Sequence, residues 1–116
     1  MKMKIELFGR DLYEIMIKYD EQVRATVGGF GSDLINLLQV RVGPKTKIEI
    51  RPAFCGNDYD AAFSLHFLLG DKTNTSIISI TKPQSYWRAI CEMHFRRKCE
   101  SFYLNQDLDL VFEFLE

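Results

Sequence analysis

Cys91 and His94 are the two residues whose types and spacing most directly suggest chemistry. They lie three positions apart, which would place them on the same side of a helix. A neighbouring imidazole can make a thiol nucleophilic at neutral pH, and the same pair could supply two ligands to a metal ion. On an inward helix face, however, a cysteine packs as a small apolar residue and a histidine bonds to the main chain. We favour this second interpretation for both residues.

A second polar group surrounds His66. Ser64, Glu49 and Arg51 would lie near it if their segments pair as strands, and such a cluster could be catalytic. The outer surface of an antiparallel sheet explains the same residues more simply. The segment 55–60, C-G-N-D-Y-D, has three amide or carboxylate side chains but lacks the residue order and closing glutamate of a calcium loop. We therefore expect a polar hairpin loop there.

The familiar motifs of nucleotide-, zinc- and serine-dependent enzymes do not occur in this sequence. It contains no GxxxxGKS/T, GxGxxG, HExxH or GxSxG pattern. A zinc site built on Cys91 and His94 would need two further ligands, and Cys55, Cys99 and His66 lie on other elements or faces without motif spacing. We predict no catalytic residue, no metal site and no cofactor.

Length and composition favour one ordinary globular domain. The chain has 116 residues, of which 47% are hydrophobic and 13% aromatic, and this suffices for a core without disulfides or a structural metal. We predict a single globular α+β domain over residues 1–116. The three cysteines form no C-x-x-C pair, the N-terminus M-K-M-K-I-E-L-F lacks the apolar run of a signal peptide, and no run of about 18 apolar residues could span a membrane. We expect a cytoplasmic protein with free thiols and no membrane association.

Strands are indicated where apolar and polar residues alternate along the chain. The predicted strands are residues 3–8, 46–54, 63–69, 75–81 and 107–114, with a hairpin turn at 70–74. Pro52 cannot donate a main-chain hydrogen bond, so its strand should lie at a sheet edge or contain a bulge. The alternation predicts an antiparallel sheet that is covered on one face.

Two segments in the N-terminal half favour helices, each with an alternative. Residues 11–27 fit a helix that Asp11 and Glu14 would cap and that G-G-F-G would end, although their alternation also allows a β-hairpin turning at G-R-D. We prefer the helix. Residues 32–42 are predicted to form a short helix that runs into a strand.

Residues 81–102 are predicted to form one amphipathic helix. Thr81 and Gln84 have the spacing of a capping box, and Pro83 suits a first helical turn. The apolar side would carry Tyr86, Trp87, Ile90, Cys91, Met93 and His94. Together the elements predict a single two-layer α+β domain with a mainly antiparallel sheet of about five strands and two or three helices mainly on one face, in the order β-α-(α/β)-β-β-β-α-β.

Charge is distributed unevenly along a chain whose net charge is −1. Residues 82–99 contain five Lys or Arg against one Glu, whereas residues 100–116 contain five acidic residues and no Lys or Arg. The two segments could lie side by side and neutralise each other, or they could stay free for charged partners. The candidate partner-binding residues are Arg88, Arg96, Arg97, Lys98, Asp107, Asp109 and Glu113. Of these, Arg96, Arg97 and Lys98 should be exposed, because they follow the last core-facing turn.

These features favour a protein that works by binding rather than by catalysis. Our leading hypothesis is a non-enzymatic cytoplasmic protein that binds another protein through charged patches, such as an inhibitor, an immunity or anti-defence factor, or an adaptor. The first alternative is nucleic-acid binding through the basic end of the 81–102 helix. It is weakened because Tyr86 and Trp87 should face away from the basic residues. The second alternative is a small enzyme that uses Cys91 or His66.

Overall fold

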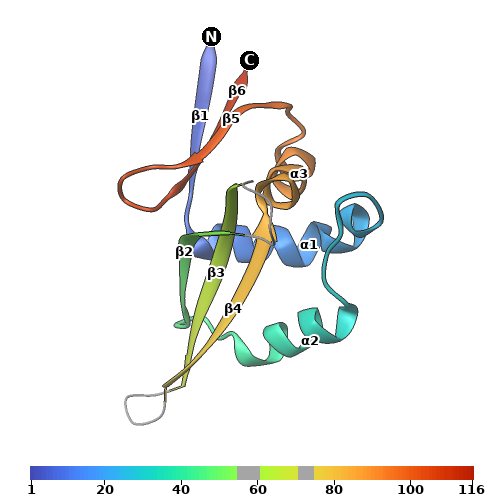
Figure 1. The fold of residues 1–116 in the computed structure, drawn as a ribbon, viewed down its shortest axis with the longest axis vertical. Coiled ribbons are helices and arrows are strands. Elements are labelled where there is room, and N and C mark those ends of the chain that lie inside the picture. The colour runs from blue at the N-terminus through green and yellow to red at the C-terminus, as the bar shows by residue number, and fades with distance from the viewer. Residues whose placement is uncertain (55–60, 71–74) are drawn as a thin grey trace.

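Within the residues that the structure describes, the fold divides six strands between two antiparallel sheets, with three helices packed against them (Figure 1). The structure is a computed structural model, and it describes residues 1–54, 61–70 and 75–116. In chain order the elements are β1 Lys2–Leu7, α1 Gly9–Val27, α2 Ser32–Arg41, β2 Lys47–Phe54, β3 Ala61–Gly70, β4 Thr75–Pro83, α3 Gln84–Phe95, β5 Cys99–Leu104 and β6 Leu110–Leu115.

One sheet has the strand order β2-β3-β4 and the other β1-β6-β5, with every neighbouring pair antiparallel. In the first sheet Ile50 pairs with Leu65 and Leu65 with Ile80, so all three share the buried face. In the second sheet Phe112 pairs with both Ile5 and Phe102. Because β1 pairs with β6, the two chain termini lie together at one end of the molecule (Figure 1).

The predicted α+β class with antiparallel strands is confirmed. The described part of the chain has six strands in two sheets, whereas the alternating segments predicted one sheet of about five strands. The alternation in 63–69 does mark a buried face, and Pro52 does lie in an edge strand, since β2 ends its sheet. The hairpin loop expected at 55–60 and most of the turn expected at 70–74 lie outside the described residues.

Helix α1 confirms the helical interpretation of residues 11–27 over the hairpin, although it begins earlier. Asp11 occupies the third helical position instead of the cap, and its carboxylate accepts the main-chain N–H of Phe8 at 2.8 Å. Asp11 thus supplies the acidic side chain of a capping box whose cap position is Phe8, three residues before the expected cap. The expected strand at the end of residues 32–42 is wrong, because α2 continues to Arg41. On one face of a strand Leu38 and Val40 would share the same environment, but Leu38 is buried and Val40 is 84% exposed.

Helix α3 is shorter than the predicted 81–102 helix at both ends. Thr81 belongs to β4, and its hydroxyl bonds that of Ser64 at 2.6 Å instead of capping the helix. Gln84 also takes no part in a capping box, because its side-chain amide donates to the carbonyl of Phe102 at 2.7 Å. At the other end Arg96 adopts a left-handed backbone with φ of 56°, and the chain reverses into β5. Strand β5 was not predicted.

Gly9 allows α1 to start directly against the edge of β2. A Cβ atom at this position would overlap the carbonyl oxygen of Ile48, which is main chain and cannot move aside. The absence of a side chain at Gly9 therefore sets how closely the helix approaches the sheet.

We predict that Gly9→Ala lowers the free energy of unfolding by about 1–3 kcal/mol, the range for overpacking a closed contact. The matched control is Gly31→Ala, because a Cβ atom there meets nothing within 4 Å and Gly31 has an ordinary backbone φ of −68°. Urea unfolding of both variants measures the difference, and equal stability of the two would contradict this role of Gly9.

Candidate functional site

Arg96, Arg97 and Lys98 form an exposed cationic cluster in the turn between α3 and β5. Their predicted exposure is confirmed. The Arg97 guanidinium donates to the Arg96 carbonyl at 3.1 Å, and within the described residues none of the three forms an ion pair with a carboxylate. The cluster is therefore free to meet an outside anion.

Arg88 has a different environment from the cationic cluster. Its guanidinium donates to the carbonyl of Cys99 and lies 4.0 Å from the carboxylate of Glu92. Glu92 in turn accepts the main-chain N–H of Cys99 at 2.7 Å. Both side chains thus hold the first residue of β5 against α3. Arg88 supports the turn that presents the cluster, and its side chain is 39% exposed.

Glu113 differs from Asp107 and Asp109, the other two acidic candidates for partner binding. Its carboxylate lies 3.8 Å from the ammonium groups of both Lys2 and Lys4 on β1, and it accepts the Tyr103 hydroxyl at 3.0 Å. Only 14% of the Glu113 side chain is exposed. Its negative charge is thus balanced within its own sheet, by strand β1 rather than by the cationic cluster.

Asp107 and Asp109 lie in the turn of residues 105–109 that joins β5 to β6. The side-chain oxygen of Asn105 accepts the main-chain N–H groups of Asp107 and Asp109 at 2.9 and 3.0 Å. Leu108 between them has a left-handed backbone with φ of 63° and is 45% exposed. Neither aspartate carboxylate forms an ion pair among the described residues, so both charges remain available.

The cationic cluster and the acidic turn lie at opposite ends of β5. Cys99 begins this strand next to the cluster, and Leu104 ends it next to the turn. A strand of this length spans roughly 17 Å, about twice the Debye length at physiological ionic strength. The cationic cluster and the acidic turn therefore do not neutralise each other.

A groove of about 370 Å³ lies between the acidic turn and the edge of β2. Its lining includes residues 48–51 of β2, Phe8 and residues 107–109. Phe8 and Leu108 are large apolar residues that are 57% and 45% exposed. The acidic turn therefore has apolar surface beside it, a combination typical of protein interfaces.

Cys91 and His94 do not form a reactive pair. Cys91 is fully buried, and burial raises the pKa of its thiol well above the usual value, so the thiolate is disfavoured. The prediction that His94 faces inward is wrong: it is exposed, and its ring meets those of Tyr19 and Phe95 edge-on. Its neighbours Met93 and Phe95 pack against the core, so His94 lies on the outer side of the last turn of α3. Within the described part of the chain no three His, Cys, Asp or Glu side chains gather as metal ligands.

The polar residues around His66 are paired with one another, within β2 and between β3 and β4. The His66 ring bonds the Ser79 hydroxyl at 3.1 Å, and Arg51 donates to Glu49 at 2.6 Å, a bond that lowers the pKa of Glu49. Ser64 is more buried than expected, at 3% exposed, and bonds Thr81. This arrangement is a polar sheet surface without an activated nucleophile.

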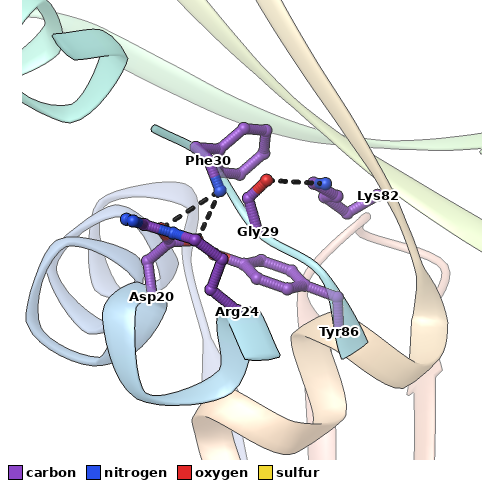
Figure 2. Close-up of polar contacts among 6 residues, drawn as sticks. All are labelled: Asp20, Arg24, Gly29, Phe30, Lys82 and Tyr86. Atoms are coloured by element: carbon purple, nitrogen blue, oxygen red, sulfur yellow. Dashed lines mark hydrogen bonds and ion pairs between the residues drawn. The ribbon is translucent and has the colours of Figure 1, made fainter. Parts of the chain in front are cut away.

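A buried polar cluster that sequence reasoning missed surrounds Asp20 (Figure 2). The Asp20 carboxylate is 1% exposed and accepts the Tyr86 hydroxyl at 2.6 Å, the Phe30 N–H at 3.0 Å and the Arg24 guanidinium at 3.1 Å. The sequence held one indication of this cluster: Asp20 lies four residues after Met16, on the apolar stripe of α1. Desolvation, reinforced by the hydrogen bond to Asp20, raises the pKa of Tyr86.

The Asp20 cluster fixes the loop after α1. Lys82 donates to the Gly29 carbonyl at 3.1 Å, and its ammonium lies 4.6 Å from the centre of the Phe30 ring (Figure 2). A Cβ atom at Gly29 would lie 2.5 Å from an Asp20 oxygen, so the loop approaches as closely as glycine permits. With donors on both carboxylate oxygens, Asp20 is a structural group.

Comparison of the chain with protein-family models, with curated proteins and with solved structures finds no match. In the described part of the chain, none of the helices combines the length and the apolar character needed to cross a lipid bilayer.

We predict that Tyr86→Phe lowers the free energy of unfolding by about 1–3 kcal/mol, because it leaves a buried carboxylate short of a donor. Tyr103→Phe is the matched control, since it removes the same hydroxyl from a residue that is 39% exposed and bonds Glu113 at the surface. That variant should stay within about 0.5 kcal/mol of the parent in urea unfolding. Similar losses in both variants would show that the Asp20 cluster is not the source of the effect.

We also predict that iodoacetamide labels Cys91 and Cys99 at least about tenfold more slowly in the native protein than in urea, because both thiols are buried and their pKa values are raised. Mass spectrometry of the peptides that contain each residue measures the rates. Rapid native labelling of Cys91 would restore the hypothesis of a cysteine nucleophile.

Proposed function

We propose that the protein acts by binding another protein, and that the cationic cluster of Arg96, Arg97 and Lys98 is part of the binding surface. One observation carries the proposal: this cluster is exposed and has no carboxylate partner within the described residues, although the chain as a whole is nearly neutral. Uncompensated surface charge of one sign steers the encounter with an oppositely charged surface. The partner should therefore present acidic side chains to the end of α3.

The acidic turn supports a protein partner over a nucleic acid. Asp107 and Asp109 would repel phosphates, whereas they can meet basic residues of a protein beside the apolar side chains of Phe8 and Leu108. Nucleic-acid binding through the cluster would also lack base stacking, because Tyr86 and Trp87 are both fully buried. Trp87 is held in the core by a hydrogen bond to the Phe63 carbonyl at 2.9 Å.

A non-enzymatic binder of this kind fits an inhibitor, an immunity or anti-defence factor, or an adaptor. All of these act by occupying a partner's surface, and none requires a catalytic side chain. The free, buried thiols of Cys91 and Cys99 fit a reducing compartment, and we place the protein in the cytoplasm on this basis.

We predict that Arg96→Glu with Arg97→Glu abolishes capture of the partner from an extract of the source cells, because it reverses the charge of the cluster. The control is Lys18→Glu with Lys45→Glu, which changes the net charge equally at two other exposed lysines that form no ion pair within the described residues. Both double variants should melt within about 4 °C of the parent. Mass spectrometry should identify proteins that the parent and the control retain and the cluster variant loses.

Equal capture by both double variants would remove the cluster from the binding surface. Binding of a random-sequence duplex DNA separates the nucleic-acid alternative, since phosphate contacts predict an affinity that falls steeply with salt. Binding of that kind, lost in the cluster variant, would replace the protein partner by a nucleic acid.

A further inference from the structure

Strand β4 forms an open edge of its sheet, and over residues 75–81 this edge lacks the features that usually block further pairing; Lys82 and Pro83 follow at the end of the strand. It is the last strand in the order β2-β3-β4, opposite β2 (Figure 1). Residues 75–81 have the sequence T-S-I-I-S-I-T, without a charge or a proline, and their register with β3 has no bulge. Proteins normally protect edge strands with lysine, proline, bulges or covering segments.

The main-chain groups on this edge can be identified from the pairing of the sheet. Pro52 has no N–H, so its pair with Phe63 cannot be of the hydrogen-bonded type, and Phe63 must direct its main-chain groups to β4. The two types of pair alternate along antiparallel strands, so the main-chain groups of Lys82, Ile80 and Ile78 bond to β3. The main-chain groups of Ile77, Ser79 and Thr81 then point away from the sheet, and none of them has a hydrogen-bond partner among the described residues.

The side chains along this edge are open to solvent as well. Ile77, Ser79 and Thr81 are all exposed, and Ile77 is 60% exposed although it is a large apolar residue. Ile78 is only half-buried at the margin of the core. An added strand would cover both isoleucines and satisfy six main-chain groups.

We propose that β4 pairs with β4 of a second copy of this chain, antiparallel about a two-fold axis at Ser79. In this register Ser79 faces Ser79, and Ile77 faces Thr81 of the second copy, so each of the three open residues forms a hydrogen-bonded pair. Ile78 then faces Ile80 of the second copy on the core side. The result is one continuous six-stranded sheet across two molecules.

The edge suits its own copy because it is self-complementary. Every side chain from 77 to 81 meets a residue of matching character, β-branched with β-branched and serine with serine, which are favourable cross-strand pairs. Lys82 falls opposite Ser76, so the two-fold axis brings no like charges face to face. Residues 75–81 carry no charge and so offer nothing to steer a charged partner, in contrast to the cationic cluster.

Charge substitutions at the two-fold axis test both the dimer and its register. Sedimentation velocity of the parent protein should show a monomer that converts to a dimer as concentration rises. Ser79→Lys and Ser79→Glu should each weaken the dimer at least tenfold, because two like charges then face each other across the axis. An equimolar mixture of these two variants should recover the dimer, because Lys then faces Glu.

Val40→Lys is the matched control, since it places the same charge on the exposed face of α2, and it should dimerise like the parent. Far-UV circular dichroism checks that each variant is folded, and Ile77→Lys serves as a second disruptive variant. A parent that stays monomeric up to about 1 mM would overturn the proposal, because even a weak pairing would be well populated there. A dimer that Ser79→Lys and Ile77→Lys leave intact, or a mixture that stays monomeric, would overturn it too.

Discussion

The structure depends on the buried hydrogen bond between Asp20 of α1 and Tyr86 of α3. A carboxylate that is almost fully buried requires donors, and the chain supplies them from three places: helix α1, the loop after it and helix α3. The residue after Tyr86, Trp87, donates to the carbonyl of Phe63 in β3. Two consecutive aromatic residues thus fix α3 to a helix on one side and to a sheet on the other. Because α3 leads directly into β5, the position of the second sheet follows from these contacts.

The charged residues near the end of α3 serve two separate purposes. Arg88 and Glu92 bond the main chain of Cys99 and so hold the reversal into β5, whereas Arg96, Arg97 and Lys98 pair with no carboxylate among the described residues. A similar division separates Glu113, which is balanced by Lys2 and Lys4, from Asp107 and Asp109. In both cases the residues within a helix or strand have partners inside the protein, and those in turns are left with free charge.

The sequence predicted well what depends on local pattern. Burial of Leu65 and Phe67, the helical character of α1 and the exposure of Arg96 follow from periodicity of two or of 3.6. Strand β5 did not, because its C-E-S-F-Y-L segment follows the helix after only the three residues 96–98, which include no glycine or proline to mark the reversal. The structural roles of Arg88 and Glu113 depend on partners distant in sequence, which no pattern reveals. In the sequence, Asp20 is a single acidic residue on the apolar stripe of α1, and an aspartate is ordinarily assumed to be exposed to solvent.

The turn at residues 105–109 has a thermodynamic consequence for recognition. Asn105 bonds the main chain of both Asp107 and Asp109, and its own N–H bonds the Asp109 carbonyl at 3.0 Å, so the turn is closed before any partner arrives. Fixing side chains at an interface costs about 0.5–1.5 kcal/mol for each one immobilised, and ordering a loop adds to this. A turn that is already rigid avoids the free-energy cost of ordering a loop. The two carboxylates and the apolar Leu108 between them are thus preorganised, and a partner that fits them would gain affinity mainly through slower dissociation.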